Sequence, residues 1–130
     1  MGRTKTELYH SGPRGVFITA TDTGVGKTLV TAALVSHLRQ RGIDVGVMKP
    51  IETGVTPSVK IQSDGARLRQ AADSHDPMAE ICPYAFRHPM APLSAADEEG
   101  VTIRVATILR AFRRLYQAHT LVAVEGVGGL

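Results

Sequence analysis

Apolar residues gather along the chain in three short, nearly continuous runs. These runs are GVFITA at residues 15–20, DVGVMKP at residues 44–50 and LVAVE at residues 121–125. Short runs that are rich in valine and other β-branched residues are typical of strands covered on both faces. The pattern therefore predicts three buried strands, of which the second is halted at Pro50.

Two longer segments repeat their apolar residues at the 3.6-residue spacing of a helix. In residues 28–42 the apolar positions are Leu29, Ala32, Ala33, Val35 or Ser36, and Leu38. In residues 101–119 they are Val105, Ile108 or Leu109, Phe112, and Leu115 or Tyr116. Gly42 follows the first segment, where we expect it to cap the carboxyl end of the helix.

The remaining connections are rich in proline, serine and threonine. Residues 52–60 are expected to form a loop, and Ser63 or Asp64 to cap a short helix that runs through Ala72. The prolines between residues 77 and 92 predict an irregular connection in which only ICPYAF could pair as a strand. The histidines at positions 37, 75, 88 and 119 show no ligand spacing and are expected on the surface.

The first apolar run leads directly into the sequence TDTGVGKT. A phosphate-binding loop has the form G-x-x-x-x-G-K-[ST] between a strand and a helix. Gly26, Lys27 and Thr28 fit that form, although Thr21 stands where the first glycine belongs. We expect phosphate oxygens to be surrounded by the loop residues Thr23, Gly24, Val25, Gly26, Lys27 and Thr28. The ordinary alternative is a glycine-rich turn with a surface lysine.

The order strand, loop, helix and strand is that of one βαβ unit with parallel strands and a right-handed crossover. Together with the loop, it predicts an α/β fold of the P-loop NTPase type, with a mostly parallel sheet and flanking helices. We expect a polar extension over residues 1–14 and a nucleotide-binding domain over residues 15–130. Ligands of such sheets collect at the carboxyl ends of the strands.

Two charged residues directly follow the second and third predicted strands. Lys49 would aim a second cation at the phosphates, and Glu125 is placed where nucleotide sites hold a metal-binding carboxylate. Each could instead simply end its strand in solvent. From the residues alone Asp64 is equally well explained as a helix cap.

Composition restricts the class of protein but not the reaction. The chain is 43% hydrophobic and 21% charged, as in ordinary soluble domains. No apolar run is long enough to span a bilayer, and the first residues lack the apolar stretch of a secretory signal. A single cysteine, Cys82, favours a small buried side chain in a reducing cytoplasm. The net charge of +3 is spread along the chain, which favours a solvated surface over binding to nucleic acid or membrane.

Four motifs in order, TATDTGVGKT, VMKPIETG, SDG and VEGVGGL, resemble the dethiobiotin synthetase family over residues 16–130. The family's loop reads T-D-T-x-V-G-K-T, which accounts for Thr21. The resemblance implies an ATP- and Mg²⁺-dependent reaction that joins 7,8-diaminononanoate and CO₂ or bicarbonate into dethiobiotin, ADP and phosphate. It also implies a homodimer in the full-length family.

The resemblance also assigns roles to particular residues. Lys27 and Lys49 would flank the transferred phosphoryl group. The metal ligands would be Thr28, Asp64 and Glu125. The residues facing the diamine or carbamate would be Thr23, Lys49, Thr53, Val127 and Gly128. The nucleotide would also contact Glu125 and Gly128.

Members of this family continue well past the final glycine-rich turn. The resemblance therefore implies the N-terminal part of a larger domain, which is either a truncated product or completed by a partner chain. A three-stranded sheet would leave an edge and an apolar face uncovered. Other functions stay open: a partition or septum-type switch ATPase, a cobalamin-type amide synthetase, and an ATP-binding fragment without turnover.

Overall fold

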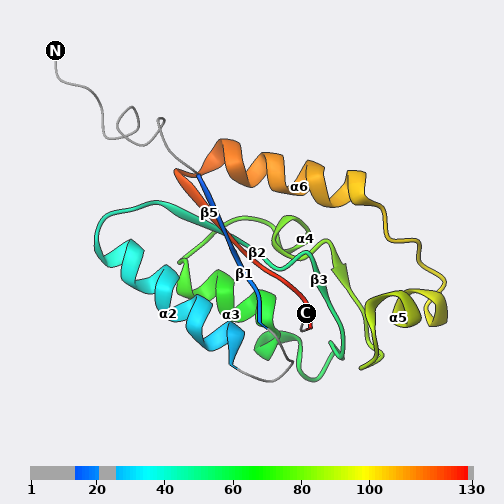
Figure 1. The fold of residues 1–130 in the computed structure, drawn as a ribbon. Coiled ribbons are helices and arrows are strands. Elements are labelled where there is room, and N and C mark those ends of the chain that lie inside the picture. Colours follow the sequence, from blue (N-terminus) through cyan, green and yellow to red (C-terminus); the bar gives the residue numbers. More distant parts are fainter. Residues whose placement is uncertain (1–13, 21–25, 129–130) are drawn as a thin grey trace, which may run out of the picture.

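The computed structural model describes residues 14–20 and 26–128, which fold around a parallel sheet (Figure 1). Its strands, in spatial order, are β1 (Gly15–Ile18), β5 (Leu121–Glu125) and β2 (Val45–Met48). β5 pairs in parallel with both neighbours, so that Ile18 lies opposite Glu125 and Met48 opposite Val124. The carboxyl ends of all three strands therefore meet at one edge of the sheet.

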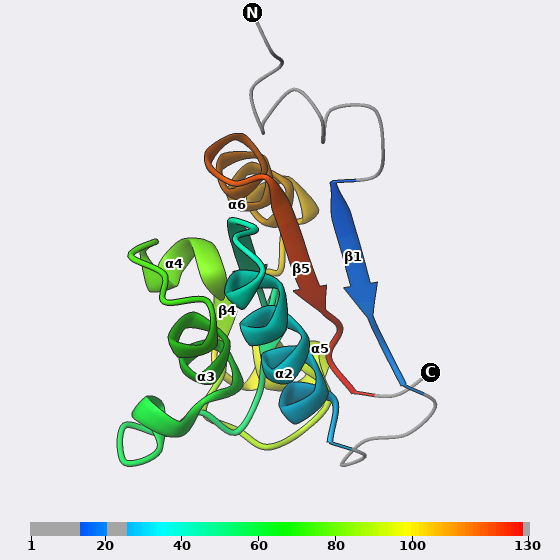
Figure 2. The same cartoon turned by 90° about the vertical axis from the view of Figure 1, so that its left-hand side faces the viewer.

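Helices cover both faces of this sheet (Figure 2). On one face, α2 (Lys27–Gln40) and α3 (Asp64–Ala71) pack against the sheet through a cluster that includes Val35, Val47 and Leu68. On the other face, α6 (Val105–Ala118) packs through Leu115 against Met48 and Val122. This is the predicted α/β arrangement of a parallel sheet with flanking helices.

A smaller element extends the fold beyond the carboxyl end of β2. The short strand β3 (Ile51–Glu52) pairs in parallel with β4 (Tyr84–Ala85). Between them lie a turn of 3-10 helix, η1 (Lys60–Gln62), then α3, then α4 (Met78–Ile81). After β4, α5 (Pro92–Glu98) packs its alanines against Phe86.

Two of the predicted connections contain more helix and strand than the sequence led us to expect. The loop expected over residues 52–60 begins with the end of β3, and the connection over residues 77–92 contains α4 and the start of α5. Of ICPYAF, only Tyr84 and Ala85 pair as a strand, because Ile81 ends α4. Pro77 is the N-cap residue directly before α4, and Pro92 is the first residue of α5, where the missing N–H of proline has no cost.

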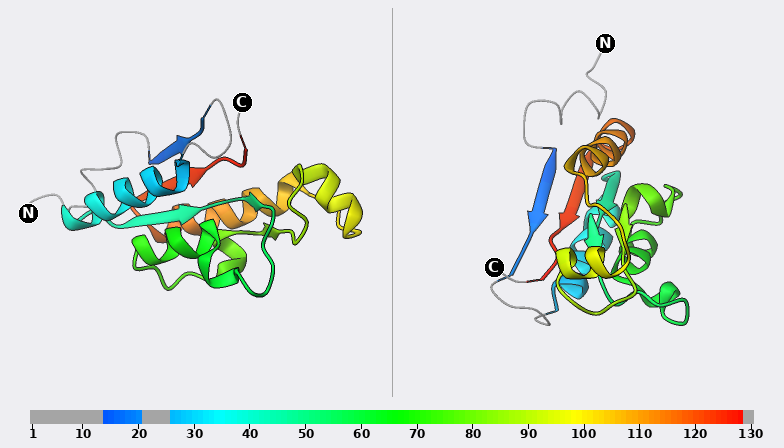
Figure 3. Two further views of the ribbon diagram at one scale, coloured as in Figure 1. Left: turned by 90° about the horizontal axis from the view of Figure 1, so that it is seen from below. Right: turned by 90° about the vertical axis from the view of Figure 1, so that its right-hand side faces the viewer.

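The burial predicted for β1 was wrong. β5 lies between β1 and β2, so β1 forms the edge of the sheet within the described residues (Figure 3, right). None of its residues is fully buried: Val16 and Ile18 are partly buried against the core, and Phe17 is 63% exposed. The uncovered edge expected of a three-stranded sheet is thus present at β1.

The helices were predicted within a few residues. The predicted face of α6 packs on the sheet through Ile108, Phe112 and Leu115, with only its first position differing, whereas the buried face of α2 is rotated. In α2 the buried residues are Thr31 and Val35, whereas Leu29 is exposed. Thr31 tolerates burial because its hydroxyl donates a 2.7 Å hydrogen bond to the Lys27 carbonyl. In α6 Val105 is exposed. No helix within the described ranges is long and apolar enough to cross a membrane.

His119, predicted on the surface, is mostly buried where three segments meet. Its Nδ1 lies 2.9 Å from Asp44 Oδ1, its Nε2 lies 2.7 Å from Asp76 Oδ2, and its side chain is only 14% exposed. The ring lies against Gly46, where an added Cβ would come within 2.6 Å of it. Burial acts to lower the pKa of His119, but the bonds to the two carboxylates outweigh it and raise that pKa.

The raised pKa of His119 predicts that stability falls as pH rises. The folded chain holds this proton more tightly than the unfolded chain, so the gain is complete below the ordinary value of 6.5 and is lost as pH rises through the raised value. Urea unfolding should show a lower free energy of unfolding above this window than below it. His119→Gln should remove this dependence, and the exposed His75→Gln should retain it. A wild-type protein with no such loss would contradict the assignment.

Candidate functional site

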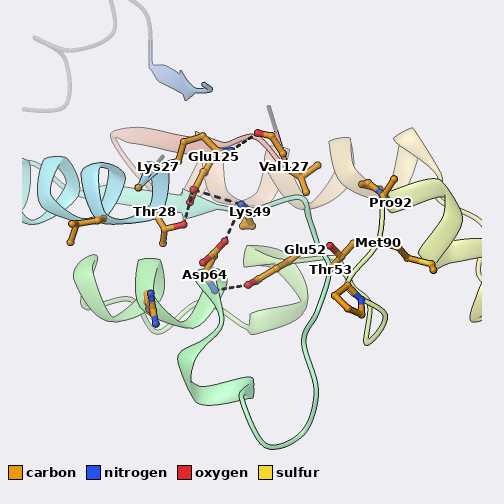
Figure 4. A pocket seen from close by; sticks show the side chains of 16 residues that line it. Lys27, Thr28, Lys49, Glu52, Thr53, Asp64, Met90, Pro92, Glu125 and Val127 are labelled. Carbon is orange, nitrogen blue, oxygen red and sulfur yellow. Dashed lines mark hydrogen bonds and ion pairs between the residues drawn. The ribbon is translucent and has the colours of Figure 1, made fainter. Parts of the chain in front are cut away.

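A cleft of about 900 Å³ opens at the carboxyl edge of the parallel sheet (Figure 4). Its walls come from the start of α2, the segments that follow β2 and β5, the first turns of α3, and the connection before α5. Most of the residues predicted to bind ligands line it: Gly26, Lys27, Thr28, Lys49, Thr53, Asp64, Glu125, Val127 and Gly128. The structure thus brings residues from segments far apart in the chain together along one cleft.

The described end of the phosphate-binding motif forms the start of α2. Gly26 precedes the helix with a φ of +80°, a left-handed conformation that glycine adopts readily. The Lys27 ammonium donates to the carbonyl of Gly128, and the Thr28 hydroxyl donates a 2.7 Å bond to Glu125 Oε1. Thr23, Gly24 and Val25, which the motif also assigns to phosphate binding, lie outside the described residues.

Lys49 stands at the centre of the site with its side chain almost entirely buried. Its Nζ lies 3.2 Å from Asp64 Oδ2 and 3.6 Å from Glu125 Oε1, and it donates a 3.3 Å bond to the carbonyl of Gly126. Lys49 is 4% exposed and Glu125 is fully buried. Because an unpaired buried charge is strongly destabilising, the ammonium and the two carboxylates depend on one another.

The two carboxylate oxygens of Glu125 differ in their contacts. Oε1 contacts Thr28 and Lys49, whereas buried Oε2 has no hydrogen-bond partner among the described residues. A buried anionic oxygen left in this state carries a desolvation cost. A cation or a bound donor in the cleft would relieve that cost.

The oxygen atoms of Thr28, Asp64 and Glu125 fit a hard divalent cation. Mg²⁺ is usually held by one or two carboxylates, with phosphate and water oxygens completing its shell. The described residues contain no group of three His, Cys, Asp or Glu side chains able to hold a metal. The two carboxylates and the hydroxyl therefore suit a metal shared with a phosphate better than a metal held by protein alone.

Sequence reasoning assigned no role to Glu52. Its buried carboxylate accepts bonds from the backbone N–H groups of Asp64, at 2.6 Å, and Gly65, at 3.2 Å. Burial raises the pKa of Glu52, and these two bonds only partly oppose that effect. The sequence feature that could have pointed to Glu52 is its position in the motif VMKPIETG, three residues after Lys49.

Two further residues lie close to the site: nothing was predicted for Arg67, whereas Cys82 was predicted to be buried. Arg67 also lines the cleft, one turn after Asp64 on α3, and carried no prediction. Cys82 is buried as predicted, and burial raises the pKa of its thiol to about 12. Such a thiol stays protonated at neutral pH and does not act as a nucleophile.

The chain is similar to known proteins over nearly all of its length. A family model described as an AAA domain matches residues 14–130. A protein of Anaeromyxobacter dehalogenans named ATP-dependent dethiobiotin synthetase BioD is 48% identical over 117 residues, covering 90% of this chain and 52% of that protein. Proteins of the same name from Thermodesulfovibrio yellowstonii and Bacillus velezensis are 42% and 39% identical, covering 89% and 90% of this chain and 49% and 50% of their own.

The resemblance and the fold class predicted from the four motifs are both confirmed by these matches. The chain spans about half the length of the curated relatives it matches. The family match covers the sheet, the flanking helices and every site residue placed above. The chain belongs to the AAA domain family.

Proposed function

We propose that this chain forms the nucleotide-binding part of an ATP-dependent dethiobiotin synthetase. The observation that carries the proposal is the convergence of two lysines and two carboxylates in one cleft, where Lys49 lies between Asp64 and Glu125. Lys27 reaches the same cleft from the start of α2. This combination of fixed cations and hard oxygen donors suits a metal-bound triphosphate. The names of the relatives supply the reaction class.

The two lysines would act on the phosphates from different sides. Lys27 follows the loop glycine and would contact the β- and γ-phosphates in place of the Gly128 carbonyl. Lys49 would neutralise charge on the transferred phosphoryl group. Mg²⁺, held by Thr28, Asp64 and Glu125, would supply charge neutralisation on the β- and γ-phosphate oxygens. In these roles the chain contributes position and charge.

The proposed substrates supply the reacting groups themselves. One amine of 7,8-diaminononanoate takes up CO₂ as a carbamate and releases a proton. A carbamate oxygen then attacks the γ-phosphorus as the bond to ADP breaks. The second amine attacks the carbamate carbon and loses a proton, phosphate leaves, and a ureido ring closes. Thr53, Val127 and Gly128 line the cleft and are assigned to hold the diamine and its carbamate.

The relatives' remaining half would provide further contacts to the adenine and the diamine, and a homodimer is part of the same proposal.

The first experiment tests whether the 130-residue chain turns over by itself. ADP release is measured with Mg-ATP and bicarbonate, with and without 7,8-diaminononanoate. We expect diamine-dependent release, and we expect Lys27→Ala to abolish it because the phosphates lose their loop cation. Lys60→Ala, which removes an exposed lysine outside the cleft, is the matched control.

Two results of this assay would contradict the proposal. ADP release that is the same without diamine would indicate a switch ATPase. Unchanged release by Lys27→Ala would remove the phosphate-binding assignment. Absence of release, with tight binding of Mg-ATP, would reduce the proposal to a nucleotide-binding unit without turnover.

Glu125→Gln tests the metal assignment. The substitution preserves shape but removes the negative charge beside Lys49, so the Mg²⁺ concentration needed for half-maximal ATP binding should rise. The expected rise exceeds the roughly 10- to 100-fold effect of losing an outer-shell partner. Calorimetric ATP titrations at several Mg²⁺ concentrations measure this shift. Glu80→Gln, whose carboxylate pairs with Arg114 outside the cleft, should not change it. A loss of folding with unchanged metal dependence would give Glu125 a structural role instead.

A further inference from the structure

Glu52 contacts the backbone of Asp64, whereas Lys49 contacts its side chain. The Asp64 carboxylate faces Lys49, at 3.2 Å, while the Asp64 N–H donates to Glu52 Oε1 at 2.6 Å (Figure 4). Glu52 Oε2 accepts a second bond, from the N–H of Gly65. One short segment of chain, residues 49–52, thus holds both the side chain and the backbone of Asp64.

This segment is itself fixed at both ends. The N–H of Lys49 donates a 2.8 Å bond to the carbonyl of Ile81 at the end of α4. The carbonyl of Glu52 accepts a 2.8 Å bond from Phe86, directly after β4. Since Glu52 is buried and anchored through β3, its carboxylate is a fixed reference point for the start of α3.

The first turn of α3 is also closely packed. A Cβ on Gly65 would lie 3.2 Å from Met78 Cε and 3.3 Å from Cys82 Cβ, which leaves little room for a side chain. The glycine lets the helix start approach α4 closely while its N–H reaches Glu52. The direction in which Asp64 projects is therefore set by the bonds of this turn to Glu52 and by its packing against Met78 and Cys82.

We propose that Glu52 is a positioning residue that holds Asp64 in place to bind a divalent cation with Glu125. The inference rests on the proposed function, because it concerns the metal ligands of that site. Glu52 acts through the backbone of Asp64, so its removal lets the first turn of α3 shift and separates the two carboxylates. Outer-shell partners of metal ligands commonly act in this way.

The competing explanation for the bonds from Glu52 is that they only cap α3. Ser63, in the same turn, provides a control for this explanation. Ser63 Oγ accepts a 3.2 Å bond from the N–H of Ala66, so Ser63 already serves as the side-chain cap of α3. Ser63→Ala removes that cap without changing a bond to Asp64. Glu52→Gln keeps the shape of the side chain but offers one acceptor oxygen to two N–H groups. The two variants therefore separate helix stability from placement of Asp64.

The test compares the Mg²⁺ concentration that half-saturates ATP binding in wild type, Glu52→Gln and Ser63→Ala, together with their unfolding free energies. We expect Glu52→Gln to raise that concentration by about tenfold or more. Ser63→Ala should leave it within about twofold of wild type while lowering the free energy of unfolding. Because Glu52→Gln is isosteric, it should stay folded at the temperature of the titration.

The outcomes distinguish this inference from the function on which it rests. If both variants shift the Mg²⁺ requirement in proportion to their loss of stability, or if Glu52→Gln shifts it no more than Ser63→Ala, Glu52 is only a helix cap and the inference is wrong. If ATP binding by the wild-type chain does not depend on Mg²⁺, the proposed metal site is wrong and the role of Glu52 falls with it.

Discussion

A buried ammonium between two carboxylates is the constraint on which the site depends. Lys49 and Glu125 directly follow Met48 and Val124, which lie opposite each other on adjacent parallel strands. The register of β2 and β5 therefore brings the two charges together with almost no exposure to solvent. Asp64 supplies the second negative charge from α3, so the helix must pack closely on the sheet for the lysine to be compensated.

The same charges link the elements that surround the cleft. Glu125 accepts a bond from Thr28 in the first turn of α2, and Lys27 on that turn contacts the segment after β5. A triphosphate entering the cleft would compete for both lysines, and a divalent cation would compete with Lys49 for both carboxylates. The lysines and carboxylates thus contact one another, or a backbone carbonyl, at the groups that the proposed ligands would occupy.

Sequence patterns predicted what depends on local residues. The three apolar runs became strands, and Gly26, Lys49 and Glu125 lie at one edge because strand ends and the loop motif are local signals. The position of β5 between β1 and β2 and the exposure of Phe17 depend on contacts between distant segments.

The burial of His119 and the role of Glu52 depend in the same way on partners more than ten residues away, which spacing does not reveal. Their partners come into reach only once the helices pack on the sheet.

The most direct test of the central claim is a crystal structure of the chain with Mg²⁺ and a non-hydrolysable ATP analogue. The account predicts phosphates at Lys27, a metal on Thr28, Asp64 and Glu125, and the Lys49 ammonium moved onto the phosphates. Phosphates bound elsewhere, with Lys49 still between the two carboxylates, would contradict it.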